Sequence, residues 1–429
     1  MTLRTRSFNR RQALKAGAGA AAVAAAVPYV SYPTRASAQG TTEVRLSTSS
    51  NGPELIALEN QVAMFEAANP TITVNIESIP DQYPTALTTN LAAGTAADIF
   101  FVDSLLFPDL VTRGQLMQLD DFLTASGGGD DFFPNLLQAF QYNGGTFGIP
   151  KDWSALAMFY NSEAFTSAGI TAPPTTWEEL TTTLQTLTDA TGVPGFVTAP
   201  DLARILPLIF QAGGGVISPD YSEILIGQQP TADALDLIVG YYNDGLATTP
   251  ADAGANDTAQ ALGQQAANAT YEGNWTYGGF AQNFPDFPLA AAPLPAGPAG
   301  QATLAFTVSY SMFAGTQIAE PAWTVINYLT GEGMLSWTTE FGVMPSRSSL
   351  TPQWLEAFPE RQLFVDAAQY ARPWQLGPGG QVFVDTVANN TLQALFAGQI
   401  DAAQALTQLQ EGAVANIQLQ APGMATPAS

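Results

Sequence analysis

The most constraining feature of this chain is an uninterrupted apolar run over residues 99–102. A strand without polar alternation is typical of the centre of a parallel sheet, where helices cover both faces. Two alternating segments, 43–48 and 72–76, precede it and predict two further strands. The stretches 53–69 and 85–93 lie between the strands and have helical spacing. The order strand, helix, strand, helix, strand therefore predicts an open α/β sheet.

Strand and helix patterns continue through the rest of the 429 residues, a length that suggests two or three domains. We expect strands near 145–161, 268–275 and 303–313, and helices over most of 175–262, at 321–329 and at 392–409. Thr175 and Glu178 have the spacing of a capping box at the start of the first of these helices. Five prolines between residues 285 and 298 predict a loop.

The chain has no Cys and no His. Disulfides, Cys-ligated metals and nucleophilic triads that use His are therefore excluded. No calcium-loop pattern occurs, and Gly213–Gly215 lacks the Lys that follows in a phosphate-binding loop. Glycoside hydrolysis needs only two carboxylates, but none of the 37 acidic residues belongs to a diagnostic pair. We expect no cofactor and no metal, and a secreted glycoside hydrolase is only a distant alternative.

Residues 1–39 are predicted to be an export signal of the twin-arginine type. They contain six basic residues and no acidic one, and Arg10-Arg11 precedes an alanine-rich apolar run. Residues 36–38 form a small-residue cleavage pattern, so the mature chain should begin at Gln39. Ala13 departs from the Phe that is usual in this signal, and ordinary secretion is the alternative. Because no Cys follows the run, we expect a soluble periplasmic or secreted protein that is not a lipoprotein.

Removal of this segment leaves seven basic residues against 37 acidic ones, a net charge of −30. Such a field repels nucleic acid and anionic membrane surfaces. A neutral or cationic ligand is easier to accommodate than an anion, although the charge also serves solubility.

Several motifs occur in an order and at spacings that carry a family resemblance. Residues 91–103 contain the apolar strand, 142–180 include a long central signature, and Glu272-Gly273-Asn274-Trp275 resembles a Gly-x-Trp element. Residues 341–347 match a late segment. Together, these motifs resemble the extracellular solute-binding proteins of ABC importers, in the group that takes up sugars.

The resemblance implies two α/β lobes joined by crossing strands, with a ligand cleft between them. Lobe one would comprise 41–149 plus 304–345, lobe two 150–303 plus 346–420, and 421–429 would be a C-terminal tail. A mono- or oligosaccharide would close the lobes by hinge bending, and the closed form would dock on membrane permease subunits. The resemblance also implies a monomer without catalytic activity. Glycerol 3-phosphate or another polyol or anion is the alternative ligand.

Sugars are recognised by aromatic faces that cover the ring and by carboxylates and amides that take the hydroxyls. The aromatic candidates are Trp153, Trp275, Tyr310 and Trp374. Trp275 lies in a turn, and Gly273 beside it would let a ligand approach. Core packing is the alternative for Trp275, and a bond to the hinge backbone is the alternative for Tyr310.

The polar candidates lie where predicted strands end, because ligands bind beyond the carboxyl ends of strands in open α/β sheets. They are Ser50, Asn51, Asp103 and Asp152, with Glu272 and Asn274 as further candidates. The alternatives are helix capping for the first three and a salt bridge for Asp152. An anionic ligand would instead bring Arg347 and Arg372 to the site. We expect internal ion pairs for both arginines.

Overall fold

A computed structural model describes residues 40–419 of the chain. Residues 42–419 belong to one compact unit. The predicted export signal lies outside the described residues.

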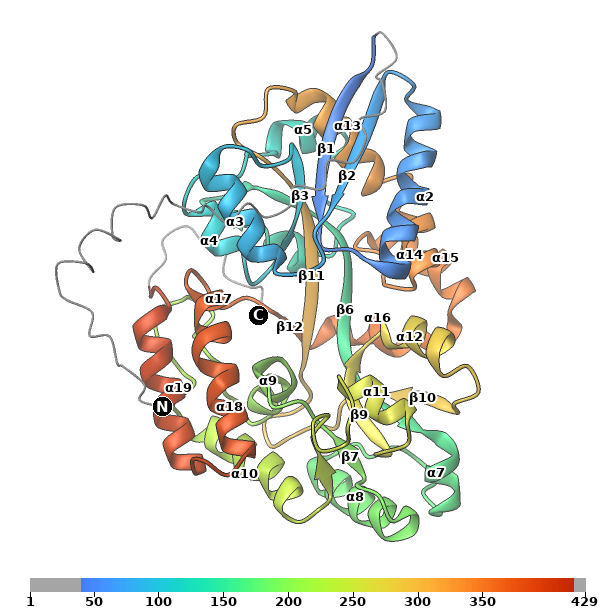
Figure 1. Cartoon of the computed structure of the whole chain (residues 1–429), viewed down its shortest axis with the longest axis vertical. Helices are drawn as coiled ribbons and strands as arrows, with labels where there is room; N and C mark the ends of the chain where they lie inside the picture. Colours follow the sequence, from blue (N-terminus) through green and yellow to red (C-terminus); the bar gives the residue numbers. More distant parts are fainter. Residues whose placement is uncertain (1–39, 420–429) are drawn as a thin grey trace, which may run out of the picture. The chain divides into compact units, whose positions relative to one another are not determined.

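Ten strands form one sheet, and Figure 1 shows it running through the middle of this unit. The order is β2-β1-β3-β11-β6-β9-β7-β8, with β10 beside β6 and β12 beside β11. Two short strands, β4 and β5, form a separate hairpin. The strands are β1 (Thr42–Thr48), β2 (Ile72–Ser78), β3 (Ile99–Asp103), β4 (Gln141–Tyr142), β5 (Gly145–Thr146), β6 (Gly148–Asn161), β7 (Phe196–Val197), β8 (Ala247–Thr248), β9 (Ala269–Gly273), β10 (Leu289–Ala292), β11 (Thr303–Met312) and β12 (Ala371–Pro373).

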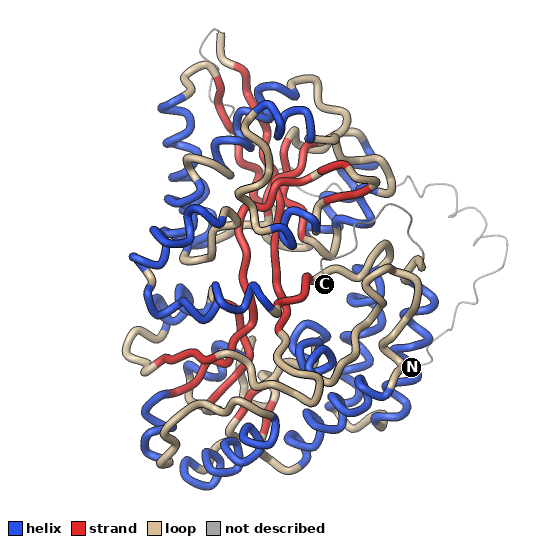
Figure 2. Tube along the Cα trace, turned by 180° about the vertical axis from the view of Figure 1, so that it is seen from behind, coloured by secondary structure: helices blue, strands red, loops and turns tan. Residues whose placement is uncertain are grey.

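Helices lie on both sides of the strands, as Figure 2 shows. Before β6 the helices are α2 (Gly52–Ala68), α3 (Tyr83–Ala93), α4 (Phe107–Val111), α5 (Asp120–Ala125) and α6 (Pro134–Gln138). Between β6 and β11 they are α7 (Ser162–Ser167), α8 (Trp177–Thr191), α9 (Leu202–Gln211), α10 (Gln229–Asn243), α11 (Thr258–Gly263) and α12 (Thr276–Asn283). After β11 they are α13 (Ala319–Leu329), α14 (Met334–Phe341), α15 (Thr351–Ala357), α16 (Gln362–Asp366), α17 (Gly380–Phe383), α18 (Asn389–Phe396) and α19 (Ala402–Asn416), with a π-helical turn at Val384–Ala388.

The predicted β-α-β-α-β order at the start of the chain is confirmed. Strand β1 pairs in parallel with both β2 and β3. Residues 99–102 of β3 are buried, as expected for a strand covered on both faces. Asp103 therefore stands at the carboxyl end of this sheet.

Two long strands cross from one half of the unit to the other. Strand β11 is antiparallel both to β3 and to β6, and the pairing with β6 has a bulge between Val308 and Ser309. Strand β6 continues beyond β11 and pairs with β9 and β10. The two halves of the unit thus share β6 and β11, and the molecule has the two-lobe α/β fold. The exact lobe boundaries stay a prediction.

The buried side chains form two large clusters, one on each side of this crossing. One contains residues of 44–149 and 310–343, together with Tyr221. The other contains residues of 156–304 and 374–417, together with Leu105. A third cluster around Trp153 and Trp354 packs beside β6. Burial of these apolar side chains supplies the main stabilising free energy.

Two local predictions need correction. Residues 285–298 are not all loop, because Leu289–Ala292 form β10, which pairs with the outer part of β6. The prolines lie outside this strand, so their missing N–H groups do not interrupt the pairing.

Helix α8 is capped by Thr176 rather than Thr175, and the Thr176 Oγ1 accepts a hydrogen bond from the Glu179 N–H at 3.2 Å. The Glu179 carboxylate accepts the N–H of Thr175, the residue before the cap, at 2.7 Å, so the predicted Thr175–Glu178 capping box does not form.

Candidate ligand-binding site

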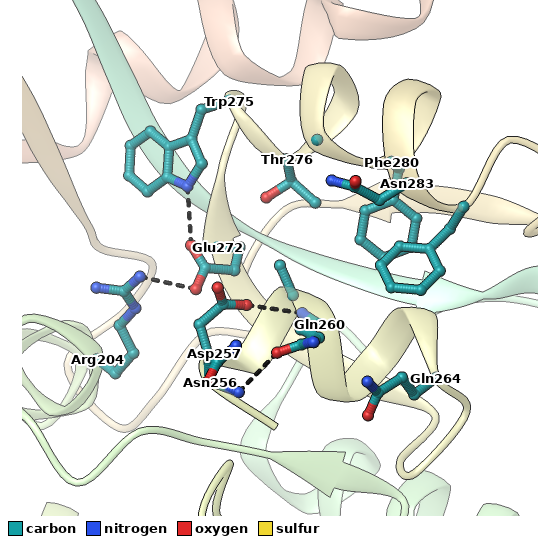
Figure 3. Close-up of a pocket in the computed structure, with 13 residues that line it drawn as sticks. Arg204, Asn256, Asp257, Gln260, Gln264, Glu272, Trp275, Thr276, Phe280 and Asn283 are labelled. Carbon is teal, nitrogen blue, oxygen red and sulfur yellow. Dashed lines mark hydrogen bonds and ion pairs between the residues drawn. The ribbon is translucent and has the colours of Figure 1, made fainter. Parts of the chain in front are cut away.

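A pocket of about 630 Å³ lies between α11, α12 and the carboxyl end of β9 (Figure 3). All its lining residues come from the chain between the two crossing strands, β6 and β11. Tryptophan and phenylalanine side chains, amides and one arginine contribute to it. The lining residues are Arg204, Asn256, Asp257, Ala259, Gln260, Gln264, Glu272, Trp275, Thr276, Gly279, Phe280, Asn283 and Phe284.

Glu272, the next-to-last residue of β9, holds one end of the pocket together. Its Oε1 accepts a hydrogen bond from Nη2 of Arg204 at 2.7 Å and another from the Thr258 hydroxyl. Its Oε2 accepts the indole N–H of Trp275 at 3.1 Å. Both carboxylate oxygens are therefore occupied by protein donors. Glu272 fixes its neighbours instead of offering a free carboxylate to a ligand.

Trp275 is half-buried and lies in the turn between β9 and α12. Its ring approaches Gly273 so closely that a Cβ atom there would stand 2.2 Å from the indole. The position of the indole is thus sufficient to account for the glycine at 273. On its other side the ring meets Phe306 edge-on, with centroids 5.5 Å apart. The indole is held by Glu272, Gly273 and Phe306 at the wall of the pocket.

Trp374 connects this aromatic group to the end of β3. Its ring lies 6.2 Å from Phe306, and the Ser104 hydroxyl donates a hydrogen bond to its carbonyl at 2.9 Å. Ser104 directly follows Asp103 at the end of β3. A chain of contacts therefore links the end of β3 to Trp275, although Trp374 itself is buried and does not line the pocket.

Amide side chains and two phenylalanines form the rest of the pocket wall. Asn256 and Asp257 precede α11, where Oδ1 of Asp257 accepts the Gln260 N–H at 2.7 Å and caps the helix. Gln264 and Asn283 stand at the far ends of α11 and α12, beside Phe284. Amides both donate and accept hydrogen bonds, which suits neutral hydroxyl groups. Rings nearby can cover apolar C–H faces.

Asp103 is half-buried at the carboxyl end of β3. Its Oδ1 accepts the Leu105 N–H at 2.8 Å, which fits the predicted capping alternative at the following turn. Burial raises the pKa of Asp103 to about 6, and the Leu105 N–H opposes this shift. A carboxylate with this environment gains from a donor on a ligand. The structure does not bring Asp103 into the pocket wall.

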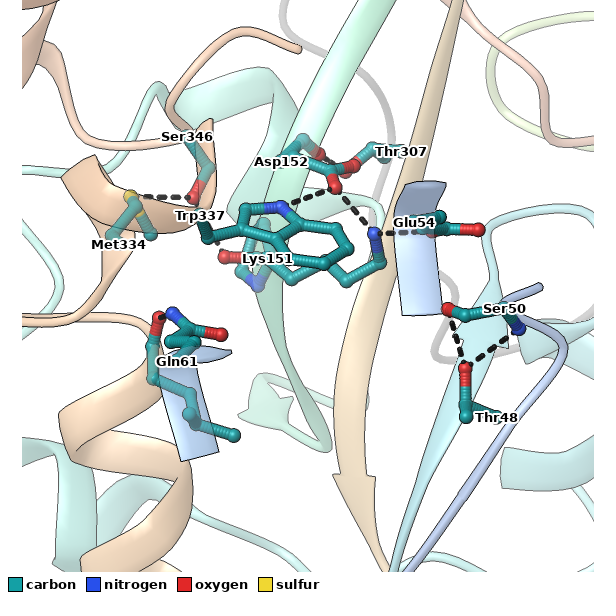
Figure 4. A network of polar contacts seen from close by, with 12 residues as sticks. Thr48, Ser50, Glu54, Gln61, Lys151, Asp152, Thr307, Met334, Trp337 and Ser346 are labelled. Atoms are coloured by element: carbon teal, nitrogen blue, oxygen red, sulfur yellow. Dashed lines mark hydrogen bonds and ion pairs between the residues drawn. The ribbon is translucent and has the colours of Figure 1, made fainter. Parts of the chain in front are cut away.

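Asp152 belongs to a buried network at the crossing strands (Figure 4). It pairs with the neighbouring Lys151, and its Oδ2 accepts the Trp337 indole N–H at 3.0 Å. The Lys151 ammonium also reaches Glu54 of α2 at 3.2 Å and lies over the rings of Phe101 and Trp337. The predicted salt-bridge alternative therefore describes Asp152 in this structure.

Two aromatic candidates are placed in the core. Trp153 is 1% exposed, packs against Phe133, and belongs to the cluster beside β6. Tyr310 is equally buried and meets Phe101 edge-on at 5.2 Å. Each has no open face for a sugar ring, because adjacent side chains of the crossing strands fill the space around it. For these two residues the structure opposes the predicted ligand contact.

The two candidates of the first loop, Ser50 and Asn51, lie in different environments. Ser50 is fully buried, and its Oγ accepts the Thr48 hydroxyl at 2.7 Å. Asn51 is exposed and occupies the N-cap of α2 without a side-chain hydrogen bond to the helix. Neither residue lines the pocket.

The two arginines of the anion alternative have protein partners. Arg347 pairs with Asp131 at 3.5 Å and lies over the Phe132 ring, as an internal ion pair was expected to do. Arg372 donates instead to the Gly214 carbonyl at 3.2 Å and lies over the Phe210 ring, so its expected ion pair is wrong. Arg372 is surface-exposed. Its charge is therefore solvated by water, and the carbonyl needs to accept only one of its N–H groups.

Sequence reasoning missed Arg204 as a site residue. Arg204 lies in the first turn of α9, where the helix dipole disfavours a cation. Such a position indicates a nearby carboxylate, and the strand residue Glu272 supplies it. The amides on α11 and α12 gave no comparable signal, because amides on exposed helices are common.

Within residues 40–419, no helix has the length and apolar character needed to cross a membrane. The same residues contain no group of three acidic side chains arranged to hold a metal ion.

The fold and the pocket define a two-lobe binding protein, and comparison with known proteins agrees. The family model described as bacterial extracellular solute-binding protein matches residues 49–334. The chain belongs to this family. A binding protein of Brucella abortus (strain 2308) is 27% identical over 350 residues, which are 78% of this chain and 83% of that relative.

Solved structures share the fold at low identity. An ABC substrate-binding protein from Listeria monocytogenes in complex with cycloalternan has a TM-score of 0.78 and 23% identity, over 87% of this chain and 98% of that one. UgpB from Mycobacterium tuberculosis, in complex with glycerophosphocholine, has a TM-score of 0.76 and 20% identity, over 88% and 98% of the two chains. The two relatives carry different ligands, so the fold does not decide the ligand.

Proposed function

We propose that this protein is the substrate-binding component of an ABC importer and that it captures a neutral sugar for delivery to membrane permease subunits. The observation that carries the proposal is the pocket between α11 and α12. It offers an indole, two phenylalanine rings and several amides, while its one basic side chain is already paired with Glu272. This composition suits a neutral polyhydroxylated ligand with apolar ring faces.

An anionic ligand is less favoured for an electrostatic reason. All seven basic residues of 40–419 have protein partners, and six of them contact a carboxylate within 4 Å. A phosphate or carboxylate would have to displace such a partner in a strongly acidic protein. Glycerol 3-phosphate and other polyol anions are thus the less favoured alternative, and an experiment can distinguish them from neutral sugars.

A thermal-shift screen of the mature chain against sugars, polyols, glycerophosphates and amino acids tests the proposal. We expect the melting temperature to rise with the concentration of a neutral mono- or oligosaccharide, because only the folded chain binds it. Small-angle scattering should show a smaller radius of gyration on binding if the lobes close. Chromatography should recover the sugar intact, since we propose binding without hydrolysis. A screen that yields only anions would contradict the neutral-sugar assignment.

We propose that residues 1–39 direct export of the folded protein through the twin-arginine route, after which it acts as a soluble monomer in the periplasm or outside the cell. Replacing Arg10 and Arg11 with lysine should leave precursor in the cytoplasm, because the route reads this pair. Immunoblots of cell fractions measure the result, and N-terminal sequencing of the exported wild type should begin at Gln39. Normal export of the double variant would favour ordinary secretion instead.

A further inference from the structure

The pocket contains an ion pair that its ligand must meet. Arg204 is the only basic residue among the described residues that line it. Its side chain is 21% exposed, so the guanidinium is accessible from the pocket. Nε of Arg204 is buried and makes no hydrogen bond within residues 40–419. Arg204 is thus the group that an anionic ligand would seek.

Glu272 already forms an ion pair with this guanidinium. It holds Nη2 of Arg204 at 2.7 Å, while Asp201 stands 4.0 Å from Nη1. Asp257, which also lines the pocket, acts on Arg204 less strongly than either of these acids. The opposite oxygen of Glu272 accepts the indole N–H of Trp275. Figure 3 shows Arg204, Glu272 and Trp275 joined in this order along one end of the pocket. The Glu272 carboxylate therefore contacts both the cation of the pocket and its indole.

We propose that Glu272 is the specificity-determining residue of the pocket: it pairs with Arg204 and orients Trp275, so that neutral ligands are accepted and anionic ligands are refused. This inference rests on the proposed sugar-binding function and adds a residue basis for the choice of ligand class. An anion entering the wild-type pocket meets a cation whose charge is already compensated, and it also meets the charge of Glu272 itself. To bind Arg204, an anion would have to displace Glu272, and this cost discriminates against the wrong ligand.

The electrostatics of the pair agree with this role. Burial alone would lower the pKa of Arg204, but the charge of Glu272, and then that of Asp201, raises it above its usual value. The guanidinium is therefore always charged, and the carboxylate held beside it compensates its attraction for an anion. Removal of the carboxylate charge should expose that attraction, because a charge pair is weakly screened in a partly buried site.

Glu272→Gln tests the proposal, because it removes the charge and keeps an oxygen that can accept the Trp275 indole N–H. Calorimetry should show that glycerol 3-phosphate and inorganic phosphate bind about tenfold or more tightly than to the wild type, a change equivalent to about 1.4 kcal/mol. Glu77→Gln is the matched control. It removes the same charge from the Arg45–Glu77 pair in lobe one, outside the pocket, and should leave anion affinity unchanged.

A reciprocal variant keeps the test decisive if Glu272→Gln folds poorly. Arg204→Gln leaves Glu272 unpaired in the pocket, and glucosamine should then gain about tenfold over glucose. If neither variant shifts the ligand preference, Glu272 does not determine specificity. Failure of the wild type to bind any neutral sugar would count against the proposed function instead, and anion binding by Glu272→Gln would still be measurable.

Discussion

Replacing Lys151 with methionine is expected to lower the free energy of unfolding by about 3–5 kcal/mol, the cost of leaving a buried charge without its partner. Lys151 is 3% exposed and neutralises Asp152, which is also buried, and Glu54. Although burial lowers the pKa of Lys151, the charges of Asp152 and Glu54 raise it above the usual value, so the ammonium stays charged. Denaturation in urea, monitored by tryptophan fluorescence, measures the loss.

The loss should come mainly from Asp152. After Lys151→Met, its carboxylate keeps only the Trp337 indole N–H as a side-chain donor, whereas the partly exposed Glu54 can turn to water. The double variant Lys151→Met/Asp152→Asn removes the orphaned charge and should recover most of the stability. No recovery would show that the contacts of the ammonium with the Phe101 and Trp337 rings matter more than its pairing with Asp152.

Arg113→Met is the matched control for the lysine variant. Arg113 is 54% exposed and stands 3.7 Å from Asp109 on the surface. An exposed pair of this kind contributes about 0–1 kcal/mol. Equal effects of the two substitutions would mean that the Lys151 network carries no special stability.

Trp275→Ala is expected to weaken sugar affinity by about 5–150-fold. Covering a sugar ring with an indole should stabilise the complex by about 1–3 kcal/mol, judged from apolar burial, and each 1.4 kcal/mol is tenfold in affinity. Replacing a fully buried tryptophan with alanine lowers the free energy of unfolding by about 3–5 kcal/mol. Because Trp275 is only half-buried, we expect a smaller loss for Trp275→Ala. Calorimetry with the sugar identified by screening, together with the unfolding midpoint without ligand, measures both.

Trp177→Ala separates the two effects. Trp177 is also half-buried, and its indole N–H also donates to a side chain, Gln211 at 2.8 Å, but it lies outside the pocket. The Trp177→Ala variant should lose about as much unfolding free energy as Trp275→Ala, while its affinity for the sugar should stay unchanged. A Trp275 variant with lower stability and unchanged affinity would place this residue with the core.

The sequence predicted the architecture better than the site because the two depend on different signals. Apolar periodicity is a local property, and it located β1, α2, β2 and β3 with small errors at their ends. Strand β10 was missed because its pairing with β6 depends on a distant segment and the prolines on both sides of it suggested a loop.

Site residues depend on what packs around them, which one-dimensional patterns do not contain. Trp153 and Trp275 both lie beside predicted turns or crossings, yet tertiary packing buries the first and leaves the second on a pocket wall. Lys151 and Asp152 are adjacent in sequence, but the bulge of the neighbouring strand pairing and the indole of Trp337 could not be foreseen. Arg204 and Glu272 are 68 residues apart, and only the fold brings them together.

A crystal structure of the mature protein with the neutral sugar found by screening would show directly whether the pocket binds the ligand. We expect a sugar ring against the Trp275 indole, with hydroxyls on the amides of α11 and α12 and the Arg204–Glu272 pair intact. A sugar bound away from this pocket, or bound with the pair broken and Arg204 turned to the ligand, would contradict this expectation.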